Sequence, residues 1–246
     1  MKLIVNADDF GYSPGVNYGI LDAHHQGILT SATMMMNMPG TDHACIISKH
    51  APDLGIGVHF VLTTGFPLTN GASLKGENGR FLTQQQFFKR ELNAKEIQDE
   101  FQAQLSKFLK AGLQPTHFDS HHHVHRQPIV WEILKEIAEG LSIPVRNPMV
   151  ASLPDQEKVL TSVFSSSFYG EKLTKEDFIR ILNDMADTEI LEIMCHPGYV
   201  DEQLLENSSY HKQRAYETSV LIDVKLKEWI QKNEIMLCHY GHVRKL

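Results

Sequence analysis

Short apolar runs alternate with stretches of helical periodicity along most of this chain. The runs are rich in aliphatic residues, and polar residues, Gly or Pro follow most of them, as is typical of buried strands. The strands that this pattern predicts are Leu3 to Ala7, Thr30 to Met36, Gly55 to Leu62, Thr116 to Ser120, Ile143 to Arg146, Ile190 to Met194 and Ile235 to Cys238.

Helices are predicted between these strands. In one of them Ile97, Phe101, Leu105 and Phe108 recur at helical spacing, and Gly112 lies just past its expected end. The predicted helices are Gly15 to Gln26, Asp42 to Lys49, Ala94 to Lys110, Pro128 to Glu139, Lys175 to Ala186 and Ser208 to Lys232. Because strands and helices alternate, we predict parallel strands joined by right-handed crossovers.

Two stretches without periodicity, residues 63–82 and 148–170, contain Gly, Pro, Ser and Asn and are predicted to be loops beside a site. Seven strands fit an open doubly wound sheet or a barrel. Neither GxGxxG nor a phosphate loop follows the first strand, so the main signature of a nucleotide-binding open sheet is missing. The length of 246 residues suits a barrel, since α/β barrels commonly run to about 250 residues as one unit.

Composition narrows the class of protein. Hydrophobic residues make up 42% and charged residues 22%, as in a globular protein, and the formal net charge of -7 without a basic stripe argues against a nucleic-acid partner. Cys45, Cys195 and Cys238 are widely spaced, which suits a reducing compartment. No signal peptide and no apolar run of about 18 residues is found. We therefore expect a cytoplasmic protein without a membrane partner.

Chemically capable residues gather where the predicted strands end. They are Asn6, Asp8 and Asp9 after the first strand, Asn37 after the second, His59 in the third, Asp119 and a histidine cluster at the fourth, Arg146 at the fifth, Cys195 and His196 at the sixth, and His239 and Tyr240 at the seventh. The carboxyl ends of parallel strands converge on one face of a barrel, where such enzymes place their chemistry. This distribution favours a barrel with an active site on that face.

The segment HFDSHHHVH, His117 to His125, holds five of the fourteen histidines. It is internal and interrupted, unlike an affinity tag. In an extended segment or in a helical turn, His121 and His125 point the same way. Two imidazoles and a distant carboxylate form a common site for a divalent metal with an open coordination position.

Asp8 and Asp9 have two interpretations. Adjacent carboxylates at a strand end can form a solvated turn or an anion at a helix N-terminus, and Ser13 with Pro14 is a candidate N-cap and first helical residue. Adjacent side chains also diverge, so one carboxylate can bind a metal while its neighbour acts as a base near the same water.

Five ordered motifs carry a family resemblance. They are NADDFG at Asn6 to Gly11, GVHF at Gly57 to Phe60, THFDSHHHVH at Thr116 to His125, SSSFYG at Ser165 to Gly170 and MCHPGY at Met194 to Tyr199. Together they resemble the YdjC-like carbohydrate deacetylases, which include chitooligosaccharide deacetylases. The resemblance covers residues 3 to about 200.

The resemblance implies a metal-dependent hydrolase that removes the N-acetyl group of an acetylated amino sugar or chitooligosaccharide, releasing acetate and a free amine. It implies a single-domain α/β fold over residues 1–246, an irregular, TIM-like (β/α) barrel, and a possible homodimer. By motif position, Asp9 and His59 are expected metal ligands. The histidine block supplies a third ligand, assigned to His121, with His125 as the next candidate. The family implies magnesium, although the ligand types are compatible with zinc.

A mechanism follows as a hypothesis. Asp8 takes the proton of the attacking water, His196 protonates the leaving amine, and Arg146 orients Asp8 or binds the sugar. His196 has an alternative interpretation as a buried histidine hydrogen-bonded to backbone. Aromatic residues in or beside the expected site loops suit stacking on sugar rings or anchoring of the loops. They are Phe60, Phe66, Phe81, Phe168, Tyr169 and Tyr199.

Two other functions remain open. A metal-dependent phosphohydrolase or sugar isomerase on the same barrel shares the Asp and His ligands, but it needs a phosphate cradle or a second carboxylate-rich metal site. A non-catalytic carbohydrate-binding or metal-binding protein predicts metal binding without turnover and leaves Asp8 without a role.

Overall fold

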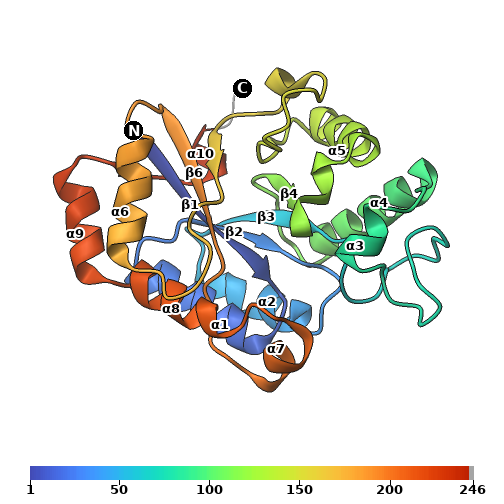
Figure 1. Ribbon diagram of the computed structural model, residues 1–246, viewed down its shortest axis with the longest axis horizontal. Coiled ribbons are helices and arrows are strands. Elements are labelled where there is room, and N and C mark those ends of the chain that lie inside the picture. Colours follow the sequence, from blue (N-terminus) through green and yellow to red (C-terminus); the bar gives the residue numbers. More distant parts are fainter. Residues whose placement is uncertain (244–246) are drawn as a thin grey trace.

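The computed structural model describes residues 1–243 and has a parallel β-sheet at its centre (Figure 1). Its strands are β1 (Lys2–Phe10), β2 (Ser31–Met34), β3 (Gly55–Phe60), β4 (Phe118–Ser120), β5 (Val163–Ser165), β6 (Ile190–Cys195) and β7 (Met236–Leu237). The order is β4-β3-β2-β1-β6-β5, with β7 also paired to β1, and every pairing between these strands is parallel. The sheet curls into a half-barrel, which confirms the predicted α/β class and TIM-like architecture.

Helices connect the strands and cover the sheet (Figure 1). They are α1 (Pro14–Gln26), α2 (Thr41–Ile47), α3 (Gln84–Phe87), α4 (Ala94–Lys110), α5 (Pro128–Leu141), α6 (Lys175–Asp184), α7 (Glu202–Asn207), α8 (Lys212–Leu221), α9 (Val224–Lys232) and α10 (Tyr240–Val243), with 3₁₀ turns at Ser48–His50, His121–Arg126 and Gln156–Lys158. The Ser13 hydroxyl accepts a hydrogen bond from the Val16 amide, and Pro14 begins α1, as the sequence predicted.

The apolar core lies between the sheet and these helices. The predicted apolar face of α4 is buried, and the Phe101 ring packs at 4.3 Å from the Phe60 ring on β3. The chain from 1 to 243 forms no helix with the length and apolar character that crossing a bilayer requires.

The predicted strand at Ile143 to Arg146 is wrong. This segment makes only an isolated bridge between Val145 and Phe118. The strand that pairs with β6 on the side away from β1 is β5, inside a predicted loop. Pro144 has no N–H to donate to a ladder, which limits pairing at this position. Val145 still lies beside β4, so the Arg146 side chain is fully buried in the interior of the half-barrel.

The long predicted helix from Ser208 to Lys232 is instead two helices, α8 and α9. The side chain of Asp223 accepts hydrogen bonds from the amides of Lys225 and Leu226, which begins a second helix. Asp residues favour such N-cap positions over helix interiors because the carboxylate competes for backbone amides.

Candidate metal and active site

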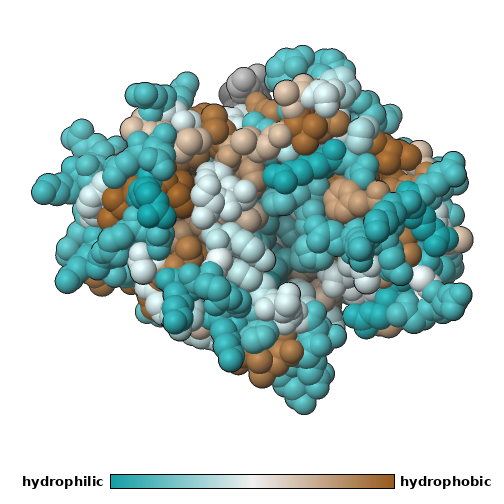
Figure 2. Space-filling view, viewed as in Figure 1, coloured by the Kyte–Doolittle hydropathy of each residue, from teal (hydrophilic) through white to brown (hydrophobic). Residues whose placement is uncertain are grey.

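A cavity of about 650 Å³ opens at the carboxyl ends of β1, β3 and β4. Figure 2 shows this face of the molecule, hollowed at its centre among hydrophilic residues. Asp8, Asp9, His59, His121 and His196 all line the cavity. The structure therefore brings together side chains from four separate segments, each at or just after the carboxyl end of a strand, as the positions of the strand ends predicted.

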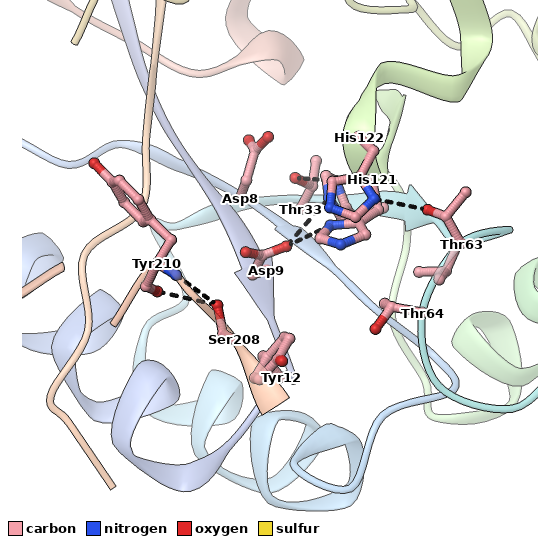
Figure 3. Close-up of polar contacts among 12 residues, drawn as sticks. Asp8, Asp9, Tyr12, Thr33, Thr63, Thr64, His121, His122, Ser208 and Tyr210 are labelled. Carbon is pink, nitrogen blue, oxygen red and sulfur yellow. Dashed lines mark hydrogen bonds and ion pairs between the residues drawn. The ribbon is translucent and has the colours of Figure 1, made fainter. Parts of the chain in front are cut away.

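Three buried side chains converge in this cavity (Figure 3). One donor atom each of Asp9, His59 and His121 lies within 4.8 Å of the other two. Asp9 Oδ1 is 2.9 Å from His121 Nδ1 and 3.4 Å from His59 Nε2. This oxygen is buried and has no hydrogen-bond partner within residues 1–243. A buried carboxylate oxygen facing two imidazole nitrogens suits a divalent metal ion, since buried polar atoms are otherwise nearly always paired.

A second group, Asp8, His59 and Asp119, also has three converging donor atoms. A cation already lies between its carboxylates, because Arg146 is 2.6 Å from Asp8 and 2.8 Å from Asp119. The geometry therefore favours the group of Asp9, His59 and His121 as the metal site.

Hydrogen bonds orient His59. Its Nδ1 lies 2.7 Å from Asp119 Oδ1, which leaves Nε2 turned toward Asp9. A carboxylate behind a histidine fixes the ring and strengthens the other nitrogen as a ligand. Burial lowers the pKa of His59, but Asp119 outweighs this effect and raises it to about 10.

Arg146 lies at the centre of a buried network of carboxylates. Its guanidinium donates to both oxygens of Asp8, at 2.6 and 2.7 Å, and to Glu192 at 2.9 Å. Glu192 also accepts a hydrogen bond from Tyr240. Burial opposes ionisation of Asp8, yet Arg146 lowers the pKa of this carboxyl below its usual range. Arg146 is fully buried and does not line the cavity, so it holds Asp8 rather than facing a ligand.

His125 lies outside the converging group. Its ring is fully buried, its Nδ1 is 2.5 Å from Ser120 Oγ, and it does not line the cavity. The expectation that His121 and His125 point together assumed an extended or helical segment. His122 and His123 instead have φ of 54° and 51°, which turns the chain and separates the two rings.

Arg214 is a site residue that the sequence analysis missed. It lies on α8, is 3% exposed, and places Nη2 at 2.6 Å from Asp9 Oδ2. The two oxygens of Asp9 are therefore divided between Arg214 and the two imidazoles. No motif marked Arg214, because only the folded chain brings α8 to the end of β1.

His196 follows β6 and lines the cavity beside two tyrosines. Its backbone amide donates to the carboxylate of Glu217, and its Nδ1 lies 3.9 Å from Glu217 Oε1. Burial lowers the pKa of His196 to about 4, and burial raises that of Glu217 to about 7. The imidazole is therefore neutral near pH 7, with Glu217 beneath it.

Comparison with known proteins places this geometry in a family. The model of the YdjC-like protein family matches residues 2–232. This chain belongs to the YdjC-like family. It is 46% identical to the carbohydrate deacetylase of Brevibacillus brevis over 99% of this chain and 100% of that protein. It is 41% identical to the chitooligosaccharide deacetylase of Yersinia enterocolitica, over 97% and 98% of the two chains.

A solved structure has the same fold along its whole length. It is a protein of Enterococcus faecalis V583 described as a candidate cellobiose-phosphate cleavage protein, with a TM-score of 0.93 and 33% identity over 99% of each chain. The predicted family is confirmed, and the buried cluster of Asp and His residues lies within a YdjC-like fold.

Proposed function

We propose that this YdjC-like protein is a metal-dependent hydrolase that removes an N-acetyl group from an amino sugar or chitooligosaccharide. The observation that carries the proposal is the buried Asp9 Oδ1, which converges with a nitrogen of each of two imidazoles while Asp8 lies next to it in the same cavity. The names of the relatives, carbohydrate deacetylase and chitooligosaccharide deacetylase, supply the substrate class.

Asp9, His59 and His121 would hold the metal ion. When bound, a divalent ion polarises an acetyl carbonyl and makes a water molecule more acidic. One carboxylate with two imidazoles suits Zn, Co, Mn or Fe by ligand type, and the family resemblance implies Mg.

Asp8 is the proposed base. Arg146 lowers the pKa of Asp8, so this carboxyl is ionised at neutral pH. Its position in the cavity lets the carboxylate accept a proton from the attacking water. Arg146 is a positioning residue in this scheme, since it holds both Asp8 oxygens and does not line the cavity.

His196 is the proposed acid for the leaving amine. Its ring lines the cavity, and its pKa of about 4 means that the imidazole is neutral at pH 7 before the reaction begins. The acid role therefore requires the proton that Asp8 takes from the attacking water to pass to His196, which then gives it to the nitrogen of the leaving amine. Glu217, bonded to the backbone amide of His196, holds this segment in place.

The test is acetate release from N,N'-diacetylchitobiose and its phosphorylated form by metal-depleted protein, with Mg, Zn, Co or Mn restored in turn. We expect metal-dependent release that is lost by about 10²-fold or more in Asp8→Asn, with metal affinity retained. The exposed Asp187→Asn is the matched control and keeps wild-type rates.

Other outcomes favour the alternatives. Release of phosphate instead of acetate supports a phosphohydrolase, and interconversion of a sugar supports an isomerase. Sugar or metal binding without any turnover supports a non-catalytic binding protein. A homodimer, expected from the family resemblance, stays a prediction that analytical ultracentrifugation tests.

A further inference from the structure

An exposed aromatic ring lines the cavity beside its polar and charged residues. Tyr169, on the loop after β5, is 52% exposed and lines the cavity together with Asp8 and Asp9. Exposed aromatic rings inside a polar pocket commonly provide a flat apolar surface for a ligand. The proposed chemistry at Asp8 and Asp9 does not use this ring.

Its neighbours hold Tyr169 in a defined orientation. The ring stacks on Tyr210 with centroids 4.2 Å apart and an angle of 9° between the planes. The hydroxyl of Tyr210 donates to Glu217 at 2.5 Å and accepts a hydrogen bond from the Gly170 amide at 3.0 Å. The pair is thus held by both the loop after β5 and α8. Because the two side chains are already ordered, a ligand that binds them loses little free energy to side-chain ordering.

The tyrosine pair lies beside the proposed reaction centre. The His196 ring contacts both tyrosines edge to face, at 5.4 Å from Tyr169 and 5.6 Å from Tyr210. Figure 3 shows Asp8 and Asp9 between Tyr210 on one side and His121 on the other. The pair therefore lies directly beside the proposed acid, with Tyr210 on the side of Asp8 and Asp9 away from His121.

We propose that Tyr169, supported by Tyr210, is the binding platform for a second pyranose ring of an N-acetylated oligosaccharide, next to the ring that loses its acetyl group. A pyranose has an apolar face of C–H groups that packs on an aromatic ring, and hydroxyls at its edge that need polar partners. Ser166 and Ser209 line the same cavity. The identity of the sugar rests on the proposed deacetylase function.

The experiment compares Tyr169→Ala and Tyr169→Phe with wild type on N-acetylglucosamine, N,N'-diacetylchitobiose and triacetylchitotriose. We expect Tyr169→Ala to raise KM for the two oligosaccharides about tenfold with kcat nearly unchanged, and to leave the monosaccharide unaffected. Tyr169→Phe keeps the ring and wild-type KM. Tyr216→Ala, a similarly exposed tyrosine on α8 outside the cavity, is the matched control.

If wild type and Tyr169→Ala have equal KM on every substrate, the proposal that Tyr169 binds a second ring is overturned. An equal increase in KM for the monosaccharide and the oligosaccharides overturns it as well. Calorimetry separates this result from a failure of the deacetylase proposal. Metal-loaded Asp8→Asn and Asp8→Asn/Tyr169→Ala are titrated with N,N'-diacetylchitobiose. A tenfold weaker affinity of the double variant supports the platform even if no variant releases acetate, whereas equal affinities, or no binding to either, overturn it.

Discussion

Asp9 divides its two carboxylate oxygens between a cation and the proposed metal site. Oδ2 is bound by Arg214, and Oδ1 faces His59 and His121 without a hydrogen bond. Asp9 also has a φ of 67°, a conformation that few residues other than Gly adopt but that Asp tolerates. The conformation turns the carboxylate of Asp9 away from that of Asp8, so the two neighbours have different partners.

Arg214→Ala is expected to weaken metal binding, because Asp9 loses the contact that orients it. Residues behind a metal ligand typically contribute about 10- to 100-fold in affinity. Titration calorimetry with Zn or Mn measures the change, and Arg180→Ala, an exposed arginine paired with Asp177, is the control. Tighter binding in Arg214→Ala would show instead that repulsion between the guanidinium and the metal dominates.

Glu217 gives a prediction about pH and stability. Burial raises its pKa from 4.5 to about 7, so the folded protein holds a proton that the unfolded chain releases between these values. The tighter binding of this proton by the folded protein makes the free energy of unfolding depend on pH. The stabilisation is fully present below pH 4.5 and is lost as the pH rises to 7, by roughly 3 kcal/mol in total. The Glu217→Gln variant removes this pH dependence, because glutamine does not ionise.

Urea unfolding of wild type and Glu217→Gln between pH 4.5 and 8 checks this sign. The difference in unfolding free energy should shift in favour of the variant as the pH rises. A difference that is constant with pH would mean that Glu217 ionises normally in the folded state.

At the scale of elements, α4 anchors the loop that forms one wall of the cavity. Glu100 is fully buried and accepts hydrogen bonds from the amides of Leu68 and Thr69 and from the Thr69 hydroxyl, and Gln104 bonds the backbone of Val61. Thr63 and Thr64, in the same loop, line the cavity. The polar positions of one helix face therefore shape the site from a distance.

Glu100→Ala is expected to destabilise the protein by about 2–3 kcal/mol, because three backbone and hydroxyl donors lose a buried carboxylate. Urea unfolding measures the loss, and hydrogen exchange should accelerate at the amides of Leu68 and Thr69. Glu136→Ala, at an exposed position of α5, provides the comparison and should change neither. Unchanged exchange at both amides would refute the anchoring role.

At the scale of the whole molecule, metal binding should stabilise the fold, since the proposed ligands lie on β1, β3 and the turn after β4 and meet only in the folded chain. An ion at 100 times its Kd adds about 2.7 kcal/mol and raises Tm by about 5–10 °C in a protein of this size. Differential scanning fluorimetry with and without metal measures this shift.

Single histidine variants assign the third ligand in the same assay. His121→Ala should lose the metal-induced rise in Tm. His125→Ala should lower Tm, because its ring is buried, yet keep the rise. The reverse pattern would move the third ligand to His125, which the structure places outside the converging group.

Local patterns in the sequence determined the element types, the α/β class and the face that carries the site. Apolar runs and helical periodicity depend on neighbouring residues, and parallel strands direct their carboxyl ends to one face. The motif that holds Asp8 and Asp9 and the one that holds His59 could be recognised for the same reason, since each lies at the end of an apolar strand.

Only the tertiary structure decided which side chains meet. The fifth strand shifted to Val163–Ser165, and two left-handed residues turned His125 away from the site, because backbone conformation in irregular segments follows packing rather than periodicity. Arg214 and Tyr210, which line the cavity, and Glu217, which bonds Tyr210, lie in or just before α8 and belong to none of the five motifs; Arg214 meets Asp9 from the other end of the chain. Contacts between residues so distant along the chain depend on how helices pack on the sheet, and no local pattern encodes them.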